Sequence, residues 1–109
     1  MGYKPKFFGV DGMDGILTVE NFDTKLAEGV MLLTPFAADA KDKAVQKFVK
    51  TYKEQYEDTP NQFAADSYDA VYALKAAIEE SKATPDMSAS DMCDALTGAM
   101  TKLTMKGLP

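Results

Sequence analysis

Near its N-terminus the chain contains the stretch Lys6-Phe7-Phe8-Gly9-Val10-Asp11-Gly12-Met13-Asp14-Gly15. A short apolar run bounded by turn residues is typical of a buried strand, so Phe7 to Val10 predicts one. This strand would place Asp11 at the start of a glycine-rich loop. Ligands of open α/β sheets bind just beyond the carboxyl ends of strands, where a carboxylate suits a cation, an amine or a hydroxyl donor. The alternative is a turn aspartate whose side chain caps its own backbone.

Composition indicates an ordinary globular protein with no nucleic-acid partner. The 109 residues are 46% hydrophobic and 27% charged, which fits one small domain or a piece of a larger one. The net charge is -5, and the 12 basic residues are all lysines spread along the chain. Because no basic stripe with interleaved aromatic residues exists, we expect no nucleic-acid binding. The acidity also gives no reason to expect attraction to anionic membranes.

Cysteine and histidine usage excludes several kinds of chemistry. The chain has one cysteine and no histidine, so it forms no internal disulfide and no histidine-dependent catalytic triad. We therefore predict no catalysis of the Ser-His-Asp or Cys-His type, and no metal site or cofactor held by cysteine and histidine. Cys93 lies in an apolar helical pattern with Met92 and Leu96, which predicts a buried and unreactive thiol. No apolar segment typical of a signal peptide follows Met1, and none is long enough for a membrane span.

Helical periodicity and breaking residues predict the order β-α-β-α-α-α, an α/β fold class. A second strand is expected over Val30 to Thr34, after a short helix from Thr18 that ends at Gly29. Three long helices follow, over Asp39 to Tyr56, Gln62 to about Ser81, and a segment that ends near Met100. Asn61 and the Ser88-x-x-Asp91 box predict the caps of the last two.

Loops between these elements are short, so we expect residues 1–109 to form a single domain without an internal boundary. Both strands lack polar alternation, which is typical of strands covered on two faces. Two strands are too few for an independent α/β sheet. The sequence therefore predicts that the remaining strands of the sheet lie outside this chain.

Asp11, Asp14 and Glu20 place three acids within a short segment. Paired carboxylates serve glycoside hydrolysis, so a small acid-dependent hydrolase is an alternative function. The acids lack the alternating spacing and the later glutamate of a calcium loop. Gly9, Gly12 and Gly15 precede neither a helix nor the lysine of a phosphate-binding loop, so we predict no nucleotide site.

Taken together, several segments resemble the branched-chain amino-acid-type solute-binding proteins of ABC importers, which are periplasmic binding proteins of the first structural type. The order and spacing of these segments match over nearly the whole chain, although no single motif is specific. The segments are Phe7-Phe8-Gly9-Val10-Asp11-Gly12, Ala27-Glu28-Gly29-Val30, Phe36, Lys47-Phe48-Val49, Tyr52, Pro60 and Phe63-Ala64-Ala65-x-x-Tyr68-Asp69-Ala70.

This resemblance implies a two-lobe protein that holds an amino acid or related small amine between its lobes, without catalysis. The chain would be the helix-rich, later part of the second lobe. By the resemblance, Asp11 pairs with the α-ammonium of the ligand. Gly12 and Met13 would add backbone and apolar contacts, and Phe63 would face the apolar part of the ligand or pack in the core.

The resemblance also implies an extracytoplasmic location and an ABC permease as partner of the full-length protein. A ligand-sensing domain of a receptor or regulator with the same fold is the alternative, and the sequence does not identify the ligand. Because two buried strands would lack neighbours, we expect the isolated chain to form a homodimer. With one wall of the cleft, we expect it to bind free amino acids weakly or not at all.

Overall fold

A computed structural model describes residues 2–108, so Met1 and Pro109, at the two ends of the predicted domain, lie outside the described residues. The chain forms two compact units, one up to Ala65 and the other Asp66–Leu108. The first unit holds two strands, three 3₁₀ turns and the first long helix. The second holds most of the second long helix, the third helix and the C-terminal tail.

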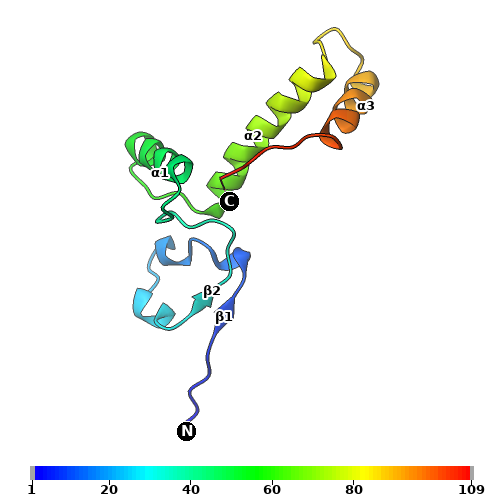
Figure 1. Ribbon diagram of the computed structural model, residues 1–109. Coiled ribbons are helices and arrows are strands. Elements are labelled where there is room, and N and C mark those ends of the chain that lie inside the picture. Colours follow the sequence, from blue (N-terminus) through cyan, green and yellow to red (C-terminus); the bar gives the residue numbers. More distant parts are fainter. Residues whose placement is uncertain (1, 109) are drawn as a thin grey trace. The chain divides into compact units, whose positions relative to one another are not determined.

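The two predicted strands are present and pair in parallel, but they are short and exposed. β1 (Phe8–Gly9) lies beside β2 (Met31–Leu32), with Phe8 opposite Met31 and Gly9 opposite Leu32 (Figure 1). The prediction that both faces are covered is wrong for the described residues, because the Phe8 side chain is 72% exposed. Apolar strand residues indicate a covered sheet, yet burial depends on neighbours that this two-stranded sheet lacks.

Three 3₁₀ turns replace the short helix predicted between the strands. They are η1 (Asp11–Met13), η2 (Ile16–Thr18) and η3 (Thr24–Ala27). Asn21 has a φ of 62°, which interrupts any right-handed helix at this point. Asp23 then starts η3 by accepting a hydrogen bond from the Lys25 N–H at 3.1 Å. The helical spacing of apolar residues was therefore a wrong indication of an α-helix in this segment.

The amphipathic character of the first long helix is confirmed. α1 (Lys43–Tyr56) begins four residues later than predicted, because the Asp42 carboxylate caps it by accepting from the Ala44 and Val45 N–H groups. Val45 and Val49 are buried, and Phe48 packs edge-to-face on buried Phe36, with ring centroids 6.0 Å apart. The opposite face carries exposed lysines and the exposed Glu54.

The second long helix, α2 (Gln62–Ser81), has the predicted bounds and the predicted cap. The Asn61 side chain accepts a hydrogen bond from the Ala64 N–H at 3.1 Å. Ala65 and Ala77 are fully buried. The larger apolar side chains expected on the inner face of this helix are instead substantially exposed, because the described elements cover little of it: Phe63, Tyr68, Val71, Tyr72, Leu74 and Ile78.

In the second unit, α3 (Ala89–Met100) is followed by a tail that returns along α2 (Figure 1). The Asp69 carboxylate accepts a hydrogen bond from the Leu108 N–H at 2.6 Å, which anchors the tail. Ala99 is buried, whereas Cys93 is exposed, so the predicted burial of this thiol is wrong. An apolar pattern shows which face of a helix could pack in a core, but no other described element covers this face at Cys93.

Among the helices that the structure describes, none has both the length and the apolar character needed to cross a membrane.

The Ser88 cap of α3 yields a stability prediction. The Ser88 hydroxyl accepts from the Asp91 N–H at 3.1 Å and donates to the Asp91 carboxylate at 2.8 Å. We expect Ser88→Ala to lower the free energy of unfolding by about 1 kcal/mol, the usual value of such a cap. Urea unfolding followed by circular dichroism measures it.

Ser90→Ala is the matched control, because Ser90 lies exposed inside the first turn of α3. Alanine is the better helix former there, so this variant should be neutral or slightly stabilising. Equal losses in the two variants would show that Ser88 does not act as a cap.

Candidate functional site

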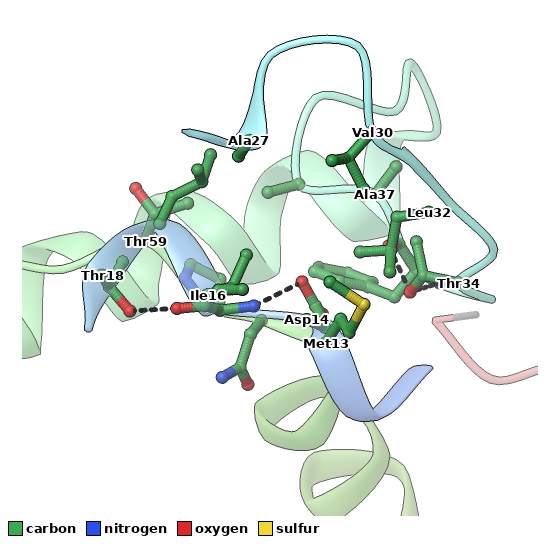
Figure 2. A pocket seen from close by; sticks show the side chains of 16 residues that line it. Met13, Asp14, Ile16, Thr18, Ala27, Val30, Leu32, Thr34, Ala37 and Thr59 are labelled. Carbon is green, nitrogen blue, oxygen red and sulfur yellow. Dashed lines mark hydrogen bonds between the residues drawn. The ribbon is translucent and has the colours of Figure 1, made fainter. Parts of the chain in front are cut away.

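The first unit contains a cavity of about 410 Å³ beside the carboxyl ends of β1 and β2. It lies between the loop that follows β1, the segment from Ala27 to Ala38, and the turn before α2. Figure 2 shows Met13, Asp14, Leu32 and Thr34 at one end of this cavity and Thr18 and Thr59 at the other. The wall is mainly apolar, with contributions from Ile16, Leu17, Ala27, Val30, Leu32, Phe36, Ala37, Ala38 and Pro60.

Close packing over Gly9 positions Met13 at the cavity. Gly9 is buried, and a Cβ at this position would collide with the Met13 sulfur and lie 3.1 Å from a Leu32 methyl carbon. The absence of a side chain at Gly9 therefore lets Met13 fold back over β1 and approach β2. The η1 turn completes this geometry, because the Met13 N–H donates to the Val10 carbonyl at 2.9 Å.

Asp14 joins the loop after β1 to the start of α2. One carboxylate oxygen accepts from the Gly15 N–H at 2.9 Å, and the other accepts from the Gln62 N–H at 2.6 Å (Figure 2 draws the first). The first N–H groups of a helix have no partner inside the helix, and the helix dipole favours a negative charge beside them. Asp14 is thus a long-range cap of α2, a role that its Asp-Gly context did not reveal.

Gln62 links the loop after β2 to the start of α2, where Asp14 also binds. The Gln62 side chain is fully buried, at 1% exposure, and its carbonyl accepts a hydrogen bond from the Thr34 hydroxyl at 2.8 Å. Thr34 also accepts from the Phe36 N–H at 3.3 Å, so it shapes the turn that buries Phe36. The sequence does not indicate that Thr34 and Gln62 form a pair, because they lie 28 positions apart.

The predicted ligand-binding residues fall in different places. Asp11 and Gly12 lie in η1, are exposed and do not line the cavity, whereas Met13 does. No hydrogen bond or ion pair within residues 2–108 uses the Asp11 carboxylate. Phe63 lies in the first turn of α2, 47% exposed, and is not part of the cavity wall. Of the four residues, the structure brings Met13 alone to the cavity, and their roles in binding stay predictions.

The cavity wall can recognise a ligand by its shape and by neutral hydrogen bonds. Asp14 is the ionisable side chain of the wall, and backbone N–H groups already occupy both of its oxygens. Asp11 and Glu20, the other acids considered for hydrolysis, are not wall residues. Within residues 2–108, no group of three or more histidine, cysteine, aspartate or glutamate side chains is placed to hold a metal ion.

Comparison with known proteins assigns the chain to a family. Residues 1–108 match the family model described as periplasmic binding protein. The match covers both compact units and includes every residue that positions the cavity. Neither a curated protein nor a solved structure matches the chain significantly.

The glycine at the edge of the cavity allows a test of the geometry. Gly15 has a φ of 83°, and a Cβ there would lie 3.2 Å from the Asn61 side-chain nitrogen. Gly29 has a similar φ of 79°, but a Cβ there would meet nothing within 4 Å. We expect Gly29→Ala to lower the free energy of unfolding by about 1 kcal/mol, the backbone cost of a left-handed alanine.

Gly15→Ala should cost more than Gly29→Ala, because it also displaces the Asn61 side chain that caps α2. Urea unfolding of the two variants gives the difference. Equal losses would contradict the close approach of Gly15 to Asn61.

Proposed function

Because the chain belongs to the periplasmic binding protein family, we propose that it is part of the solute-binding component of an ABC importer. The solute would be an amino acid of the branched-chain type, or a related small amine, held between two lobes. The family is one of solute-binding proteins, and the match over residues 1–108 is the observation that carries the proposal.

Asp11 is the residue we propose to bind the ammonium group of the solute. It begins η1 one residue after β1 ends, near the carboxyl end of a parallel strand, which is where α/β proteins bind ligands. Its carboxylate is exposed and has no partner within residues 2–108, so it is available to an incoming cation. A hydrogen bond between an ammonium and a carboxylate is among the stronger polar contacts in proteins.

The other predicted contacts take subsidiary roles in this proposal. Gly12 presents its backbone in the same 3₁₀ turn, and Met13 joins that turn to the apolar cavity wall. Phe63 is half-exposed in the first turn of α2, so its ring is accessible to the apolar part of a ligand. A first lobe would supply the groups that hold the ligand carboxylate.

The proposed protein works outside the cytoplasm and delivers its solute to an ABC permease. This location follows from the family, whose members are described as periplasmic. The binding step requires no chemistry on the solute, so the proposal includes no catalytic residue, metal or cofactor.

Replacing Asp11 tests the proposal. In the two-lobe protein that contains this chain, we expect Asp11→Asn to weaken amino-acid binding by about 2 to 5 kcal/mol, the cost of truncating one partner of a buried charge pair. Affinity for ligands without an amine should barely change. Calorimetric titration with L-leucine and a panel of other amino acids, against their deaminated analogues, measures both.

Glu20→Gln is the matched control, because Glu20 is an exposed acid of the same segment outside the cavity wall. It should leave affinity unchanged. Equal affinity of the wild type and Asp11→Asn would disprove the assignment of Asp11, whereas turnover of a glycoside that is lost in both variants would instead support the hydrolase.

We also propose that the isolated chain self-associates, most simply as a two-fold dimer. Each strand of the two-stranded sheet has one edge without a strand partner within residues 2–108, and Phe7, Phe8 and Leu33 are largely exposed. Exposed apolar strand edges favour pairing with another chain. Sedimentation equilibrium should detect dimers, and a titration of the isolated chain with L-leucine should show weak binding or none. A monomer at high concentration would contradict the dimer.

A further inference from the structure

We propose that Asp14 is a positioning residue for ligand binding, because it fastens the turn that carries Asp11 to the first turn of α2. This inference rests on the proposed function of Asp11. By our assignment, Asp14 contacts neither the ammonium group nor any other part of the ligand. The evidence for the inference is a chain of hydrogen bonds within the first unit.

The first link joins Asp14 to Asp11 itself. The Asp14 N–H donates to the Asp11 carbonyl at 2.8 Å, which closes the η1 turn. Met13 lies between them and packs over Gly9, so the turn is also held against β1. The Asp11 backbone is therefore linked both to β1 and to Asp14.

The second link joins Asp14 to the helix. Its carboxylate accepts from the Gln62 N–H at 2.6 Å, and Gln62 is fully buried with its side chain bonded to Thr34. Both bonds at the Asp14 carboxylate are charge-assisted, which makes them stronger and shorter than neutral ones. The turn after β1, the turn after β2 and the first turn of α2 thus meet at one partly buried polar cluster, in which Gln62 is fully buried.

Two variants separate this positioning role from a local one. Asp14→Ala removes both acceptors, and Asp14→Asn keeps an oxygen for one donor but presents an NH₂ group to the other. Asp58→Asn is the matched control: Asp58 also accepts from the next N–H, that of Thr59, at 2.7 Å, but no long-range hydrogen bond involves its side chain within residues 2–108.

Hydrogen exchange tests the fastening without any ligand. In Asp14→Ala we expect faster exchange at the Gln62 amide, and little change at helical amides in the centre of α1. Asp58→Asn should leave the Gln62 amide protected. Unchanged Gln62 exchange in Asp14→Ala would overturn the proposal whatever the solute is.

Coupling to Asp11 tests the positioning. In the two-lobe protein, titrated with L-leucine, Asp14→Ala should weaken binding about tenfold, within the range of coupling between residues of one network. In the Asp11→Asn background the same change should weaken binding by much less, since the carboxylate to be positioned is gone. Equal effects in the two backgrounds would overturn the positioning role, because a general loss of stability does not depend on Asp11.

The two proposals fail in distinguishable ways. If the wild type binds neither L-leucine nor another amino acid, the proposed function fails together with the ligand-positioning role, and fast Gln62 exchange in Asp14→Ala would then establish a structural fastening only. If the wild type binds and Asp11→Asn does not, but Asp14→Ala binds normally, the inference about Asp14 alone is wrong.

Discussion

The hydrogen bond from the Gln62 N–H to the Asp14 carboxylate is the constraint on which the first unit depends. It joins residues 48 positions apart, and it lies where a helix begins with unpaired donors. The two strands pair over only two residues each, so they contribute few ladder hydrogen bonds of their own. Buried Gln62 also accepts a hydrogen bond from Thr34, which links the loop after the second strand to the start of α2. The loops that leave the sheet are therefore held by polar groups rather than by a deep apolar core.

Apolar burial in the described residues is correspondingly sparse. The buried apolar side chains are small apart from Phe36 and the two valines of α1, while large ones such as Phe8 and Val71 remain exposed. Much of the surface of the described strands is uncovered, yet hydrogen bonds hold the turns that follow them. A carboxylate that binds a ligand needs a fixed position, because a hydrogen bond depends on distance and angle.

Several features of the fold could be predicted from local sequence. The two strands, the bounds of α2 and the caps at Asn61 and Ser88 follow from apolar runs, breakers and capping residues, whose effects are local, whereas the parallel pairing of the strands appears only in the structure. The segment between the strands was misassigned as a helix, because Asn21 adopts a positive φ that periodicity does not reveal. Cys93 was misassigned to the interior, because an apolar helical face shows which side suits a core but not whether a neighbour covers it.

The sequence by itself determined the two strands, the long helices, the placement of Asp11 close behind the first strand, and the resemblance that agrees with the family match. Only the tertiary structure decided that Asp14 and Gln62 meet, that Thr34 joins them, and that Met13 folds over Gly9 into the cavity wall. The physical reason is the distance along the sequence over which each effect acts. Caps, turns and periodicity act over a few residues along the chain, whereas a hydrogen bond between distant residues exists only after the backbone has brought donor and acceptor together.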